Sequence, residues 1–254
     1  MRYEILGPLR VTDGTQTLPV SGPKIRVVLA TLLIRSGQIV PLEDLIGEVW
    51  GEHPPRRATA ALYVYVSQLR KLLGADGEGP IHTETPGYVL RTGPDELDLQ
   101  QFQTLAARGR QSMRDTRLDQ ARTAFEEALA LWRGPTLIEL QNGPIVSGFA
   151  LWLEEMRLEC TELLVEANLR LGRHREQVGF LQGLVRDHPL YEAFHRQLML
   201  ALYHSERRAD ALMAYRSART VLNRELGLEP GRRMRELHQS ILRSTDDLDV
   251  RHAV

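Results

Sequence analysis

The sequence predicts a mainly α-helical chain with a small β part, organised as two consecutive regions. Two observations carry this prediction. Residues 1–93 combine short extended segments, three helical patterns and a hairpin, whereas residues 97 to about 242 are helical in period throughout. With 254 residues, 43% of them hydrophobic, the chain is long enough to build two packed cores.

Short strands are expected at the start of the chain. Residues 3–6, 9–11 and 17–20 favour strands, and Gly7-Pro8 and Asp13-Gly14 favour the turns between them. Ser21 is the expected N-cap of a first, largely buried helix that carries Pro23 in its first turn and ends near residue 36.

Two further helices and a hairpin follow. The second helix begins at Pro41, and its apolar residues recur at helical spacing up to Trp50. Pro54-Pro55 forces a turn before a third helix, which runs from about Arg57 to Leu73. Residues 81–85 and 88–90 predict the two strands of a hairpin. Strands, three helices and a hairpin, in this order, predict a winged helix-turn-helix domain of residues 1–93.

The segment Thr92-Gly93-Pro94-Asp95 interrupts the pattern and is the expected domain boundary. Beyond it, a shift of 34 residues superimposes Leu169 on Tyr203 and Glu176 on Asp210. Thirty-four residues is the tetratricopeptide period, in which each repeat is a pair of helices. Residues 94–243 are therefore expected to form a tetratricopeptide-like all-α domain, with residues 117–132 as a further copy and residues 244–254 as a frayed tail.

The third helix has two different faces when its residues are placed at about 100° intervals. Leu62, Val66, Leu69 and Leu73 form a core stripe, and the opposite face holds Arg57, Ala60, Val64, Ser67, Gln68 and Lys71. A glutamine can pair bidentately with adenine, and a valine suits a thymine methyl group. We therefore predict that Val64, Gln68 and Ser67 contact bases of duplex DNA, although an exposed valine is also common without any function.

Residues around this face are candidates for phosphate contacts. From His53 to Ala75 the sequence has no acidic residue, although the formal net charge of the chain is −1. Charge alone fits a solvated helix equally well, and it is the helix order and the hairpin that favour DNA. The predicted phosphate contacts are Arg57, Thr59, Tyr63, Arg70 and Lys71 on the helix and Thr83 and Thr85 in the hairpin.

Residues 64–71, Val-Tyr-Val-Ser-Gln-Leu-Arg-Lys, resemble the recognition helix of OmpR/PhoB-type winged-helix regulators. Gly7-Pro8-Leu9 and Ser21-Gly22-Pro23-Lys24 are similar to the version of this domain in Streptomyces antibiotic regulatory proteins. Residues 128–135, 171–174, 188–190, 197–203 and 225–230 resemble the bacterial transcriptional activation domain of that family. The resemblance covers nearly the whole chain.

The resemblance implies a pathway-specific activator of secondary-metabolite genes that binds direct repeats near the −35 element and contacts RNA polymerase holoenzyme. We expect two protomers, a homodimer on DNA, to lie head to tail on the repeats. The resemblance places the expected polymerase contact between the second and third helices, at Glu52, His53 and Arg56. The family commonly has Arg where Gln68 stands, and the hairpin carries Glu84, which would repel phosphate.

The sequence offers little support for an enzyme. Motifs of phosphate-binding loops, dinucleotide sites, hydrolase nucleophiles and zinc peptidases are absent. The spacings among His174, His188, His195 and His204 do not suit a metal, so neither a metal nor a cofactor is expected. Cys160 is the single cysteine, and its helical context predicts an inert buried thiol.

A cytoplasmic, nucleoid-associated protein is expected, because the sequence has no apolar run of membrane-spanning length and no recognisable export signal. Two alternatives to an activator remain open. The helical repeats alone would suit a protein-interaction scaffold, and a repressor would use the same DNA-binding domain. Salt-sensitive binding to promoter DNA would distinguish a DNA-binding regulator from a scaffold. A reporter gene would distinguish an activator from a repressor.

Overall fold

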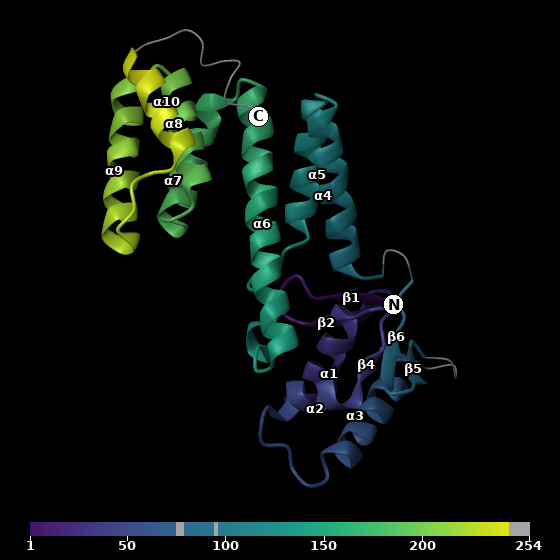
Figure 1. The fold of residues 1–254 in the computed structure, drawn as a ribbon. Coiled ribbons are helices and arrows are strands. Elements are labelled where there is room, and N and C mark those ends of the chain that lie inside the picture. The colour runs from purple at the N-terminus through teal and green to yellow at the C-terminus, as the bar shows by residue number, and fades with distance from the viewer. Residues whose placement is uncertain (75–78, 94–95, 244–254) are drawn as a thin grey trace. The chain divides into compact units, whose positions relative to one another are not determined.

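The computed structural model describes residues 1–74, 79–93 and 96–243, and it confirms a mainly α-helical chain with two small sheets (Figure 1). The chain forms two compact units, Met1–Ala107 with Glu127–Leu158, and Arg108–Glu126 with Glu159–Val254. In the predicted boundary Thr92–Asp95, positions 94 and 95 lie outside the described residues, as does the predicted tail of residues 244–254.

The first unit contains the winged helix-turn-helix. One antiparallel sheet has the order β1 (Arg2–Glu4), β2 (Arg10–Asp13) and β3 (Gln16–Leu18). Three helices follow, α1 (Pro23–Ile34), α2 (Leu42–Trp50) and α3 (Ala58–Leu73). A second antiparallel sheet has the order β4 (Val40–Pro41), β6 (Gly87–Leu90) and β5 (Ile81–Glu84). The predicted hairpin is thus confirmed, and β4 joins it as a short third strand that the sequence pattern does not indicate.

Two local predictions at the start of the chain are wrong. The first strand ends at Glu4, because the backbone amides of Ile5 and Leu6 donate hydrogen bonds to the carboxylate of Asp98, at 2.9–3.0 Å, instead of to a partner strand. Burial raises the pKa of Asp98, although these two amides and the Arg133 charge lower it.

The expected N-cap is also displaced by one residue. The first helix begins at Pro23, so Gly22 and not Ser21 is its N-cap, with no side-chain cap. Gly22 has a φ of 94°, a backbone conformation that serine rarely adopts.

Residues 127–158 pack into the same unit as the winged helix. The backbone amides of Arg133 and Leu137 donate to the carbonyls of Leu6 and Gly7, at 2.9 and 3.0 Å. A Cβ atom at Gly7 would lie 3.1 Å from the Cβ of Arg133, which explains why a glycine stands there. The division at residue 93 stays a prediction, and a fragment that ended there would lose these bonds.

The remaining helices continue the chain to residue 243. They are α4 (Asp98–Arg114), α5 (Leu118–Ala130), the 3-10 helix η1 (Ile138–Leu140), α6 (Pro144–Arg170), α7 (His174–Asp187), α8 (Glu192–His204), α9 (Arg208–Leu226) and α10 (Arg232–Arg243). In the second unit α8 packs against α7, α9 and α10. This arrangement confirms the expected all-α second half.

Three helix pairs share one kind of turn, and all three turns lie in the second unit. Thr116, Gly172 and Glu206 have positive φ values of 56°, 78° and 62° at the turns between α4 and α5, α6 and α7, and α8 and α9. At each turn the next amide, that of Arg117, Arg173 or Arg207, bonds a carbonyl five residues back. Such left-handed turns end helices and satisfy their last carbonyls. The turns at Gly172 and Glu206 are 34 residues apart, whereas those at Thr116 and Gly172 are 56 apart, so the copy at residues 117–132 stays a prediction.

No helix among the described residues is long and apolar enough to cross a membrane.

Candidate nucleic-acid interface

The helix α3 buries one face and exposes the opposite one. The predicted core stripe is confirmed, since Leu62, Val66, Leu69 and Leu73 are buried. The exposed residues include Thr59, Ala60, Tyr63, Val64, Ser67, Gln68 and Lys71, with Arg57 exposed at the N-cap. Tyr63 and Val64 are each about half exposed, at 51% and 52%. All the predicted base and phosphate contacts of this helix except Arg70 are therefore open to solvent.

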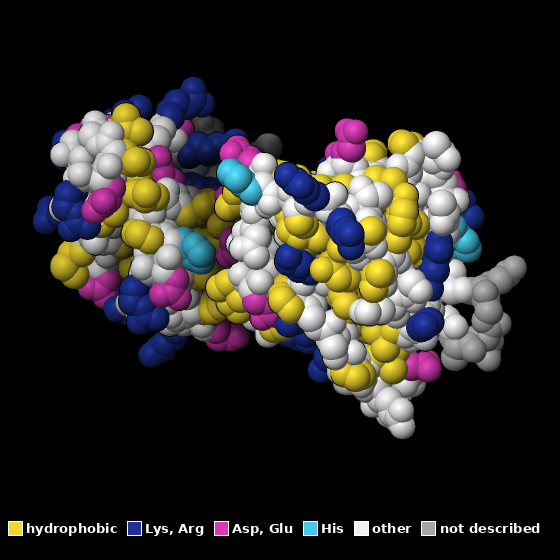
Figure 2. Space-filling model, turned by 90° about the horizontal axis from the view of Figure 1, so that it is seen from below, with side chains coloured by type: hydrophobic (Ala, Val, Ile, Leu, Met, Phe, Trp, Pro, Cys, Tyr) yellow, Lys and Arg dark blue, Asp and Glu magenta, His cyan; other side chains and the backbone are white. Residues whose placement is uncertain are grey.

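We call the exposed set Arg57, Ala60, Val64, Ser67, Gln68 and Lys71 the polar face of α3. Figure 2 shows the surface of the winged helix. Lys and Arg side chains there are spread among neutral and hydrophobic ones, and acidic side chains are sparse. A surface of this kind can approach a polyanion without a large repulsive field.

The predicted phosphate contacts Arg70 and Thr83 lie close together, and they form a hydrogen bond with each other. The guanidinium of Arg70 donates to the carbonyl of Ile81 at 2.9 Å and to the hydroxyl of Thr83 at 2.8 Å. Its Cζ also lies 5.6 Å from the ring centroid of Tyr88. Arg70 thus fastens the hairpin, the wing of the domain, to α3. Thr85 is exposed at the hairpin turn.

The negative charge of the wing has a partner. Glu84 forms a salt bridge with Arg91 at 2.6 Å, directly after β6. Sequence reasoning missed Arg91 because it follows the hairpin strands rather than lying in them. The pair lowers the repulsion of phosphate that Glu84 alone would cause.

The other side of α3 carries an aromatic stack. The rings of Trp50 and Tyr65 are 6.0 Å apart and nearly parallel, at 21°. The Nζ of Lys24 lies 5.0 Å from the centroid of the Trp50 ring. The sequence pattern does not indicate this contact, because Lys24 and Trp50 are 26 positions apart in the chain.

The predicted polymerase contacts lie together in the loop between α2 and α3. Glu52, His53 and Arg56 are exposed there. Gly51 begins the loop with a φ of 62°, and its amide closes the end of α2 on the carbonyl of Gly47. The loop therefore projects from a well-terminated helix and is accessible to a protein partner.

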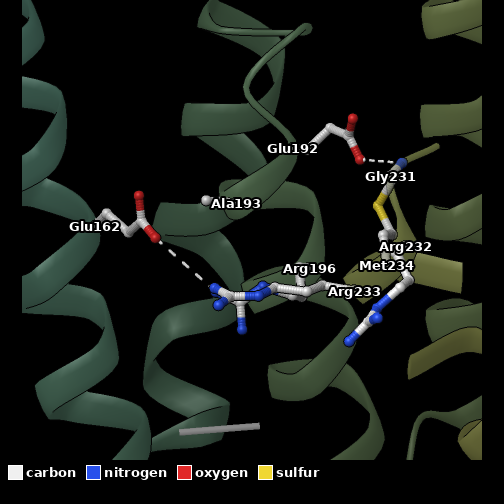
Figure 3. Close-up of a pocket in the computed structure, with 8 residues that line it drawn as sticks. All are labelled: Glu162, Glu192, Ala193, Arg196, Gly231, Arg232, Arg233 and Met234. Carbon is white, nitrogen blue, oxygen red and sulfur yellow. Dashed lines mark hydrogen bonds and ion pairs between the residues drawn. The ribbon is translucent and has the colours of Figure 1, made fainter. Parts of the chain in front are cut away.

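The second unit contains a cavity of about 500 Å³ between α6, α8 and α10 (Figure 3). Both of its glutamates have partners within the lining. Glu192 accepts the amide of Gly231 at 2.7 Å, and Glu162 lies 3.9 Å from Arg196. These contacts hold α10 against α8, and we assign no ligand to the cavity.

Nothing in the described part of the chain indicates catalysis by a metal or a thiol. No group of three or more His, Cys, Asp or Glu residues there could hold a metal ion. Cys160 is buried, as expected, and burial raises the pKa of its thiol to about 12, so the nucleophilic thiolate does not form near neutral pH.

The chain matches two protein families. Residues 20–90 match the family described as transcriptional regulatory protein, C terminal, and residues 97–242 match the bacterial transcriptional activator domain. A winged helix followed by this helical domain defines a class of bacterial transcription regulators. The chain belongs to the Streptomyces antibiotic regulatory protein family of transcriptional regulators.

Relatives extend the match over the whole chain. Regulatory protein AfsR of Streptomyces griseus is 39% identical over 98% of this chain, which corresponds to 25% of AfsR. Regulatory protein DnrI of Streptomyces peucetius is 36% identical over 98% of this chain and 94% of DnrI. This chain thus spans about a quarter of AfsR and most of DnrI.

A solved structure has the same fold. It is Mycobacterium tuberculosis EmbR, in complex with a low affinity phosphopeptide, which superimposes with a TM-score of 0.95 and 35% identity. The match covers 99% of this chain and 67% of the EmbR chain.

Proposed function

We propose that this protein is a sequence-specific transcriptional activator of secondary-metabolite genes. It places the polar face of α3 in the major groove of direct repeats near the −35 element and recruits RNA polymerase. One observation carries the proposal. The third helix of the winged helix has no acidic residue, and its polar face is exposed to solvent opposite a buried apolar stripe.

Within this proposal the residues divide by chemistry. Val64, Ser67 and Gln68, on one exposed strip, contact bases. Arg57 and Lys71, at the two ends of the polar face, bind phosphates. Thr59 and Tyr63 on α3 and Thr85 in the hairpin are further phosphate contacts. Arg70 and Thr83 position the wing through their mutual hydrogen bond, and any phosphate that they meet comes second to that task.

The exposed loop with Glu52, His53 and Arg56 is the proposed polymerase contact. Its support is its exposure between two helices that belong to the DNA-binding domain. Membership in a family of transcriptional regulators favours this role over catalysis and over a scaffold without DNA. We further propose that the protein acts in the cytoplasm at the nucleoid, as two protomers on one site.

Footprinting combined with in vitro selection on the full chain tests the proposal. We expect protected direct repeats whose spacing is one or two helical turns of about 10–10.5 bp, with two protomers bound. Inverted repeats would contradict the head-to-tail arrangement, and the absence of any preferred sequence would contradict the function.

The sign of regulation needs a second measurement. A repressor would bind through the same face of α3 and differ only in where its site lies relative to polymerase. A reporter gene behind the selected site should rise in expression when the protein is supplied. Falling expression would establish the repressor instead.

A further inference from the structure

We propose that Lys24, supported on the indole ring of Trp50, binds a DNA phosphate on the side of α3 opposite the wing. This inference rests on the proposed function and adds to it a second phosphate-binding surface. That surface consists of Lys24, Trp50 and Tyr65, and none of the three was among the predicted contacts.

The geometry of α3 places this surface on the opposite flank from the wing. With Leu62 at zero and about 100° per residue, the polar face centres near 190°, Arg70 lies near 80° and Tyr65 near 300°. Arg70 and Tyr65 are therefore displaced by about 110° to either side of the polar face. Arg70 holds the wing, and Tyr65 stacks on Trp50 of α2. In Figure 1, α2 and β5 likewise lie on opposite sides of α3.

A helix in the major groove has a phosphate strand along each of its two sides, because the groove is bordered by both backbones. The wing side offers Arg70, Thr83 and the Glu84–Arg91 pair. The other side carries the two aromatic rings, with Arg57 at the start of α3 as a further positive charge. Lys24, beside the Trp50 ring, adds a second positive charge for the phosphate strand on that side.

The contacts of Lys24 leave its charge available. Its side chain is exposed, and it forms no salt bridge with any carboxylate that the structure describes. Arg26, two positions later on the same helix, is by contrast paired with Glu139. The Trp50 ring steadies the Lys24 ammonium group without neutralising it, because the attraction comes from the ring quadrupole.

The chemistry of lysine is compatible with this contact. Of 32 basic residues only two are lysine, Lys24 and Lys71, and both lie in the winged helix. Lysine is a compact point charge on a flexible stem, whereas arginine is a planar fork that suits bidentate partners. A lysine is well suited to a single phosphate oxygen, which is the contact already proposed for Lys71.

The test measures how the affinity of the full chain falls with salt, for Lys24→Ala and for wild type. Each lost phosphate contact should reduce the slope of log Kobs against log salt by about 0.9. Between about 50 and 200 mM salt, wild-type affinity should therefore fall about three- to fourfold more than that of the variant. The loss should be equal on the selected site and on an unrelated duplex.

Two controls complete the design. Lys24→Arg should keep the wild-type slope because it keeps the charge. Arg26→Ala should also keep it, because Arg26 is paired with Glu139. An unchanged slope in Lys24→Ala would overturn this inference while leaving the proposed function intact. Wild-type protein that binds no duplex in a salt-sensitive way would instead overturn the proposed function itself.

Discussion

Arg70 shows how one side chain can serve the architecture of a binding surface. Its guanidinium bonds both the backbone of β5 and the hydroxyl of Thr83, and it lies over the Tyr88 ring. Three different contacts to the wing fix the orientation of the hairpin relative to α3. The wing thus depends on a residue that the sequence pattern predicts as a phosphate contact.

We expect Arg70→Met to lower the free energy of unfolding by about 1–3 kcal/mol, because the substitution removes both hydrogen bonds and leaves the Ile81 carbonyl unpaired. Thr83→Val removes only the bond to the hydroxyl and should cost less, about 0.5–1.5 kcal/mol. Urea unfolding measures both. Equal and negligible effects would show that the wing does not depend on Arg70.

The exposed face of α3 is the part of the site that the sequence predicts best. Helical period alone separates Leu62 and Val66 from Val64 and Gln68, and burial follows that separation. Contacts between side chains of different elements were not predictable in this way. The Lys24–Trp50 and Glu84–Arg91 pairs depend on how elements pack and not on spacing along one helix.

At the scale of elements, a buried glutamate connects α2 to α6. Glu48 is only 2% exposed, and its carboxylate accepts the amides of Ile145 at 2.5 Å and Val146 at 3.2 Å. These amides are the unpaired donors at the start of α6, where the helix dipole also favours a negative charge. Glu48 therefore caps a helix that begins 96 residues further along the chain.

We predict that Glu48→Ala lowers the free energy of unfolding by about 1–3 kcal/mol, because two amides lose a charged acceptor. Glu43 lies exposed on the same helix, and Glu43→Ala should change stability by at most about 0.5–1 kcal/mol. Chemical denaturation distinguishes the two variants. If both cost the same small amount, the cap contributes nothing measurable.

Glu48 also shows why part of the fold escapes sequence analysis. In the amphipathic pattern of α2 it occupies a polar position, and nothing nearby reveals a partner almost 100 residues later. Asp98, which bonds Ile5 and Leu6 across more than 90 positions, is a second case. The 34-residue repeat, by contrast, was predictable because its turns are local.

At the scale of the whole molecule, stability should depend on pH through two histidines, His195, which is buried, and His238, which is half-buried. Burial lowers the pKa of His195, and burial together with the Arg216 charge lowers that of His238. The folded state thus favours the neutral form of both histidines. As the pH falls, these histidines take up protons in the unfolded chain at a higher pH than in the folded protein. The stabilisation is fully present above the ordinary pKa of 6.5 and is lost as the pH falls below it.

His238→Phe isolates this effect. The His238 ring is stacked on Tyr215 with centroids 3.8 Å apart, so phenylalanine keeps the packing and removes the titration. Between about pH 7.5 and 5.5 the variant should lose less stability than wild type in urea unfolding. Burial raises the pKa of Glu166, so this group makes the protein more stable as the pH falls. Wild type and variant share Glu166, so its contribution cancels when their pH profiles are compared. Identical pH profiles would contradict the prediction.

The central claim is that Gln68 of α3 contacts bases and that Lys71 of α3 contacts phosphates. In vitro selection and titration with Gln68→Ala and Lys71→Ala, beside wild type, test it most directly. Gln68→Ala should cost about 1–3 kcal/mol on the selected site and relax one base position in each repeat. Lys71→Ala should weaken every sequence alike, lower the salt slope by about 0.9 and leave the base preferences unchanged. The same base preferences and the same uniform loss in both variants would contradict the account.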